Sequence, residues 1–146
     1  MKRLLSTLAL LPAATLATPL HHFDVAATFQ PPKRAGGIGS VAVVFRALDP
    51  DLRINESPAP RLRLDLTQAV LSDKQAPPPS DAPAYDPLTA RYLDLAKPIL
   101  FPVAIAPAAP KGPQTVKASV IYFYCSQREA WCRRGTADVA IEVTVP

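Results

Sequence analysis

The stretch ADVAIEVTV, residues 137–145, decides the fold class of this 146-residue chain. Apolar side chains occupy every second position, and most of the positions between them are polar. The alternating apolar residues are Ala137, Val139, Ile141, Val143 and Val145. Because successive side chains of a β-strand point to opposite faces, this period of two predicts a strand with one buried face.

The same alternation recurs upstream and predicts further strands. The inward residues of two of them are Val41, Val43, Phe45 and Ala47, and Leu62, Leu64 and Leu66. Residues 115–124 begin in alternation and end in the continuous run IYFY, which predicts a strand that becomes buried on both faces. Another strand is expected near residues 99–105, after a short helical turn within residues 89–96.

Eighteen prolines and several short turn clusters separate these segments. Closely spaced strands with such turns are typical of an antiparallel β-sandwich or barrel. Residues 72–87 are polar and rich in proline, so we expect an extended connection without packed structure. The sequence shows no internal repeat and no linker between two cores, so residues 18–146 are predicted to form one all-β domain.

The N-terminus has the pattern of a secretory signal peptide, residues 1–17. Lys2 and Arg3 precede an apolar run over residues 4–17, which is shorter than the roughly 20 residues of a membrane-spanning helix. Small residues at the end of this run predict cleavage before Thr18. The mature protein is therefore expected to be periplasmic or secreted, and no later segment is long and apolar enough to span a membrane.

The charge balance argues against a nucleic-acid-binding surface. The chain has 16 basic and 12 acidic residues, a formal net charge of +4, and loss of Lys2 and Arg3 leaves 14 against 12, or +2. Nucleic-acid binding needs lysines and arginines gathered on one face. The stretch GGIGS, residues 36–40, lacks the lysine and the following helix of a phosphate loop, so we interpret it as a flexible turn. The sequence therefore gives no reason to expect a cofactor. Asn55 begins a glycosylation-like triplet and is interpreted as a turn residue.

The only two cysteines are Cys125, at the predicted end of one strand, and Cys132, at the start of the next, with six residues between them. Neighbouring antiparallel strands have Cα atoms about 4.5–5.5 Å apart, a distance that a disulfide can bridge. In an exported chain the pair is therefore predicted to form one disulfide. Three interpretations stay open: a structural bridge, an exchanging redox pair, or a metal site completed by other ligands such as His21 and His22.

The neighbours of the pair bear on its reactivity. Arg133 and Arg134 follow Cys132 directly, and cations stabilise a thiolate. The aromatic residues Tyr124 and Trp131 are expected to shield the sulfurs from solvent. Cys125 follows the buried run, where an apolar setting raises a thiol pKa, so Cys132 is the predicted point of attack.

Three stretches in sequence order carry a family resemblance. They are RINESPAPRLRLDL (residues 53–66), PVAIAPAAPKG (residues 102–112) and SVIYFYCSQREAWC (residues 119–132). Together they resemble the N-terminal periplasmic domain of the thiol:disulfide interchange protein DsbD. The chain also resembles the small β domains that close some thioredoxin and NHL-repeat proteins.

The resemblance implies an immunoglobulin-like sandwich in which Cys125 and Cys132 pass electrons between protein partners. A membrane reductase or a thioredoxin-like donor would reduce the pair, and the pair would in turn reduce disulfides of periplasmic protein partners. The competing hypothesis is a non-enzymatic binding or accessory domain whose disulfide only pins the last hairpin. A measured reduction potential separates the two, because structural bridges lie below about −300 mV.

Overall fold

The computed structural model describes residues 21–72 and 79–146, and the predicted signal peptide lies outside these ranges. Almost all regular structure in them is β. The strands are β1 (Phe23–Gln30), β2 (Gly39–Ala47), β3 (Leu52–Ile54), β4 (Arg61–Leu64), β5 (Leu71–Ser72), β6 (Ile99–Ile105), β7 (Gly112–Ser126) and β8 (Trp131–Val145). One 3-10 turn, Leu66–Gln68, follows β4.

The strands form two antiparallel sheets. The first has the order β1-β2-β6-β5. The second is built on β7, which pairs with β8 along one edge and with β3 and β4 in succession along the other. The predicted all-β antiparallel fold is therefore confirmed.

One hydrophobic core joins the two sheets. The first sheet contributes buried residues such as Val41, Val43 and Phe101, and the second contributes Ile54 and Ile141 among others. Because side chains of both sheets share one cluster, the sheets pack face to face as a sandwich. The core lies between the inner faces, as the alternating sequence pattern requires.

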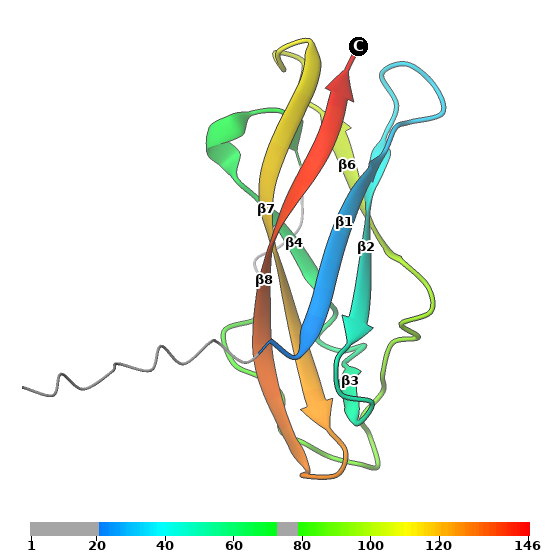
Figure 1. The fold of residues 1–146 in the computed structure, drawn as a ribbon, viewed down its shortest axis with the longest axis vertical. Helices are drawn as coiled ribbons and strands as arrows, with labels where there is room; N and C mark the ends of the chain where they lie inside the picture. The colour runs from blue at the N-terminus through cyan, green and yellow to red at the C-terminus, as the bar shows by residue number, and fades with distance from the viewer. Residues whose placement is uncertain (1–20, 73–78) are drawn as a thin grey trace, which may run out of the picture.

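The β7–β8 hairpin dominates the second sheet. Its two strands pair without interruption from Gly112↔Val145 to Ser126↔Trp131. Figure 1 shows this twisted hairpin running the length of the molecule, with its orange tip at the end opposite to the β1–β2 loop. Residues at the tip are therefore far from that loop.

Most predicted strands are found where they were expected. The apolar positions of the last strand face the core, residues 121–126 are all buried, and β6 occupies the expected range. The predicted helical turn within residues 89–96 is wrong. No helix forms there. Hydrogen-bonded turns lie at the two ends of this range, where Ala90 N–H donates to Asp86 O at 2.9 Å and Lys97 N–H donates to Asp94 O at 3.2 Å, and between them Tyr92 pairs with Asn55 in an isolated β-bridge.

The connection between β5 and β6 contains no strand or helix over residues 79–87, as expected, and residues 73–78 lie outside the described ranges. Its later part is not free of the sandwich. Leu93 N–H donates to Ile54 O and Glu56 N–H donates to Arg91 O, each at 2.9 Å, so this segment lines the edge beyond β3. In the described ranges no helix is long and apolar enough to cross a membrane.

Candidate functional site

The cysteine pair lies at the tip of the β7–β8 hairpin. Cys125 and Cys132 are directly opposite in register, with Cα atoms 4.1 Å apart, and form the predicted disulfide. One further pair, Ser126↔Trp131, separates the bridge from the turn over residues 127–130. Ala130 closes that turn in the left-handed region, with φ of 54°.

The two sulfur-bearing residues differ in exposure. Cys125 is 0 % exposed, whereas Cys132 is half-buried. Thiol–disulfide exchange requires an attacking thiolate to reach a sulfur in line with the bond. Of the two residues only Cys132 keeps appreciable exposed surface, and the expected attack at its sulfur stays a prediction.

The alternation of side chains assigns the disulfide to the outer face of the second sheet. Tyr122 and Tyr124 belong to the core, so Cys125 on β7 points the other way. The register then brings two rows of three residues together across β3, β7 and β8. We call this group the cysteine face; it comprises Arg53, Cys125, Cys132, Asn55, Phe123 and Arg134.

Arg133 and Arg134, which the sequence placed together beside Cys132, lie on opposite faces of β8. The guanidinium of Arg133 sits over the ring of Trp131, 4.3 Å from its centroid, on the core side. Arg134 shares the outer face with Cys132. Of this pair, Arg134 alone has its side chain on the face that an attacking thiolate must approach.

Tyr124 and Trp131 also lie behind the disulfide rather than over it. Their rings meet edge to face at 5.8 Å, and His22 stacks near both. They extend an aromatic cluster at this end of the core, whose members are His22, Phe23, Phe45, Tyr122, Tyr124 and Trp131. These rings pack against the core side of the hairpin tip, and Cys132 on the other side is half-buried.

Burial controls the ionisation of the two tyrosines in the cluster. Loss of solvation raises the pKa of Tyr122 to about 12. Burial also raises the pKa of Tyr124, although the nearby Arg133 cation opposes that shift. Both hydroxyls therefore stay protonated at neutral pH, which suits packing rather than proton transfer.

Asp51 fastens the hairpin tip to the turn before β3. Its carboxylate accepts hydrogen bonds from the hydroxyl of Ser126 and, at 2.9 Å, from the backbone N–H of Arg128. The Arg128 side chain also pairs with Asp49 at 3.4 Å. The bond from Ser126 is the main reason why the pKa of Asp51 lies below its usual value.

Sequence reasoning missed two members of the cysteine face. Arg53 is the direct partner of Cys125 on β3, and its guanidinium donates to the carbonyl of Leu52 at 3.0 Å. Asn55, interpreted as a turn residue, is 4 % exposed, and its Oδ1 lies 3.0 Å from Sγ of Cys125. A period of two assigns Arg53 on β3 and Asn55 just after it to the same face, but it does not reveal which strand pairs with β3.

Metal binding finds little support around the pair. In the described ranges no three residues among His, Cys, Asp and Glu gather as a ligand set. His22 packs its ring 5.4 Å from that of Tyr124, on the core side of β7, and does not share the face of the cysteines. The pair therefore stands as two sulfurs bonded to each other.

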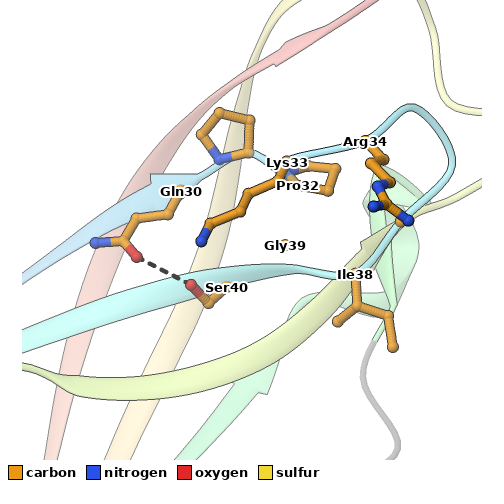
Figure 2. Close-up of a pocket in the computed structure, with 9 residues that line it drawn as sticks. Gln30, Pro32, Lys33, Arg34, Ile38, Gly39 and Ser40 are labelled. Carbon is orange, nitrogen blue, oxygen red and sulfur yellow. Dashed lines mark hydrogen bonds between the residues drawn. The ribbon is translucent and has the colours of Figure 1, made fainter.

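Residues of the β1–β2 loop line a hollow, shown in Figure 2, and Figure 1 shows that this loop lies at the end of the molecule opposite to the hairpin tip. Figure 2 shows Lys33 and Arg34 beside the hollow, and Ser40 Oγ donates to Gln30 Oε1 at 3.1 Å. The glycine-rich stretch enters strand β2 rather than a helix, so the predicted turn is confirmed. The residues that line the hollow include no acid, cysteine or histidine, and we assign no chemistry to the hollow.

No protein-family model matches the chain, and neither a curated protein nor a solved structure matches it. The resemblance to the DsbD domain accordingly stays a prediction. The functional argument rests on the geometry of the cysteine face.

Proposed function

We propose that this protein exchanges electrons with protein partners through the Cys125–Cys132 disulfide. The observation that carries the proposal is the difference in exposure between the two bonded residues, because Cys125 is wholly buried and Cys132 is half-buried. An exchanging pair needs one sulfur that a partner can attack and one that resolves the mixed disulfide. Cys132 takes the first role and Cys125 the second.

Reduction of the pair proceeds in two steps. A partner thiolate attacks Sγ of Cys132, the Cys125–Cys132 bond breaks, and Cys125 leaves as a thiolate that takes up a proton. A second thiol of the partner then attacks the partner's own sulfur in the mixed disulfide and releases Cys132. The partner dithiol loses two electrons and becomes a disulfide, and the protein gains two electrons and two protons.

Arg134 and Arg53 lie on the two sides of the disulfide on the cysteine face, Arg134 on β8 and Arg53 on β3. Arg134 lies two residues from Cys132 on the same side of β8, where its cation attracts an incoming thiolate. Arg53 is opposite Cys125 and stabilises the negative charge that develops when Cys125 leaves. Both effects lower the barrier to opening the bridge.

The proposal includes an exported location, periplasmic or secreted, because disulfides persist in oxidising compartments. The partners of the proposed reaction are thioredoxin-like proteins or a membrane reductase, as the resemblance to the DsbD domain implies. Reduced protein would pass its electrons to other disulfides in that compartment.

A second candidate is a non-enzymatic binding or accessory domain with a structural disulfide. The contacts of Asp51 favour it, since they hold the same hairpin tip that the bridge holds. In that case the disulfide and Asp51 serve one purpose, a rigid tip. The reduction potential decides, because a value well below −300 mV is typical of structural bridges.

Trapping of a mixed disulfide tests the proposed exchange. Cys125→Ser leaves Cys132 free. We expect its thiolate to form a stable mixed disulfide with a thioredoxin-like protein that keeps one active-site cysteine, activated as a disulfide with a small aromatic thiol that leaves. Cys132→Ser, the matched control, leaves only the buried Cys125 and should trap at least tenfold less. Equal trapping by both variants, or none by either, contradicts the proposal.

A further inference from the structure

Asn55 is fixed against the buried sulfur. Its side-chain Oδ1 lies 3.0 Å from Sγ of Cys125, and the residue is 4 % exposed. Its backbone N–H donates to Phe123 O at 2.9 Å, and its other side pairs with Tyr92 in a β-bridge. The backbone of Asn55 is therefore held on both sides, and its side chain is buried against Cys125.

The meaning of this contact depends on the redox state. A disulfide sulfur carries no hydrogen, so in the oxidised protein the amide oxygen faces an atom that cannot donate to it. A reduced Cys125 carries an S–H group, which donates weakly to oxygen. Since a buried polar atom without a partner costs free energy, the contact favours the reduced state over the oxidised one.

We propose that Asn55 is a positioning residue that holds reduced Cys125 as a protonated thiol and thereby shifts the pair toward reduction. The inference rests on the exchange function proposed above and adds the group that regulates it. Accepting a hydrogen from the neutral thiol opposes ionisation, and burial acts in the same direction. Cys132 is more exposed than Cys125 and keeps the role of nucleophile.

The oxidative half of the reaction shows the effect. The Cys132 thiolate attacks a partner disulfide, that S–S bond breaks, and one partner thiolate leaves. Cys125 then gives up its proton to the solvent or to that thiolate and attacks Sγ of Cys132, so that the second partner thiolate leaves. The protein loses two electrons, the partner disulfide gains two, and the step that waits for the Cys125 proton prolongs the mixed disulfide.

Asn55→Leu removes both polar atoms of the amide at similar side-chain size, and Asn55→Ala is the second variant should leucine disturb the fold. We measure the equilibrium of the full chain with reduced and oxidised glutathione. Loss of one weak hydrogen bond to the reduced state is expected to lower the equilibrium constant for reduction about five- to tenfold. This is about 20 to 30 mV toward more negative potential.

Ser126→Ala is the matched control. Ser126 is as buried as Asn55 and adjoins Cys125, but its hydroxyl bonds Asp51 on the other face of β7. The Ser126→Ala substitution should leave the reduction potential of the cysteine pair unchanged. An unchanged potential in both Asn55 variants, or an equal shift in Ser126→Ala, overturns the proposal.

The pH dependence of alkylation by iodoacetamide supplies a readout that a purely structural role would not move. In the Cys132→Ser background, where Cys125 is the single thiol, Asn55→Leu should lower the thiol pKa and speed alkylation at neutral pH. A raised thiol pKa would mean that the NH2 group of the amide faces the sulfur, and would overturn the proposal. The far-UV circular dichroism of each variant shows whether the β-fold is retained.

The failure of this inference and the failure of exchange are distinguishable. A wild-type potential well below −300 mV, with no trapping by Cys125→Ser, refutes exchange. A wild-type potential in the exchanging range that neither Asn55 variant alters refutes the role of Asn55 alone.

Discussion

Neutralising Arg134 should slow reduction of the disulfide, whereas neutralising Arg133 should not. Arg134 and Cys132 are two positions apart on one face of β8. The Cβ atoms of such residues are about 7 Å apart, twice the rise per residue of a strand. At that distance an effective dielectric constant between about 40 and 80 gives roughly 0.6 to 1.2 kcal/mol between a cation and a thiolate. A barrier raised by this amount slows attack about three- to sevenfold.

The measurement is the rate of reduction by glutathione at low ionic strength for wild type, Arg134→Gln and Arg133→Gln. Arg133 is the matched control because its guanidinium lies over Trp131, on the opposite face of β8 from the disulfide. The difference between Arg134→Gln and wild type should shrink as salt rises, since exposed charges at this separation are screened within about 8 Å at 0.15 M. Equal slowing by both variants, or no slowing by Arg134→Gln at low salt, refutes the assignment of faces.

Two further predictions concern the fold around the site. Gly135→Ala should lower the free energy of unfolding in urea by about 1 to 2 kcal/mol, because a Cβ there would lie 2.5 Å from ring atoms of the buried Tyr122. The Tyr122 ring packs against that of Phe45, with centroids 5.1 Å apart. A neutral or stabilising result contradicts this packing. Asp51 has a folded-state pKa below its usual 3.8, so the stability that it contributes is present above pH 3.8 and is lost as the pH falls through the folded value. Asp51→Asn should therefore flatten the acid dependence of the urea midpoint, and an unchanged slope would show that the contact with Ser126 is not responsible.

The fold was predictable because the sequence pattern and the burial pattern coincide. Val139, Ile141 and Val143 alternate in the sequence and alternate again between core and solvent in β8. The run ending at Tyr124 was expected to be buried on both faces, and residues 121–126 are all buried. The helical turn within residues 89–96 failed since this segment pairs with the edge beyond β3, a long-range contact that local propensity does not contain.

The candidate site was predictable only in part, and the reason is register. The disulfide follows from two cysteines flanking a short hairpin loop, so local sequence suffices for it. Arg53 and Asn55 contact Cys125 across a sequence separation of about 70 residues, because β3 pairs with the C-terminal residues of β7. A one-residue change in that register would exchange the face of every side chain on β3 and remove both residues from the sulfur.

The geometry of the cysteine face also limits how a partner can dock. Because Cys125 is 0 % exposed and the rings of Tyr124 and Trp131 lie on the core side, the proposed reaction requires a partner sulfur to approach the bridge at Cys132 from the outer face of the second sheet. The groups that it meets there are Arg134 and, beyond Cys125, Arg53. In the proposed reaction, recognition therefore depends on these two cations and on the fixed hairpin tip, while the aromatic cluster contributes by keeping that tip rigid from behind.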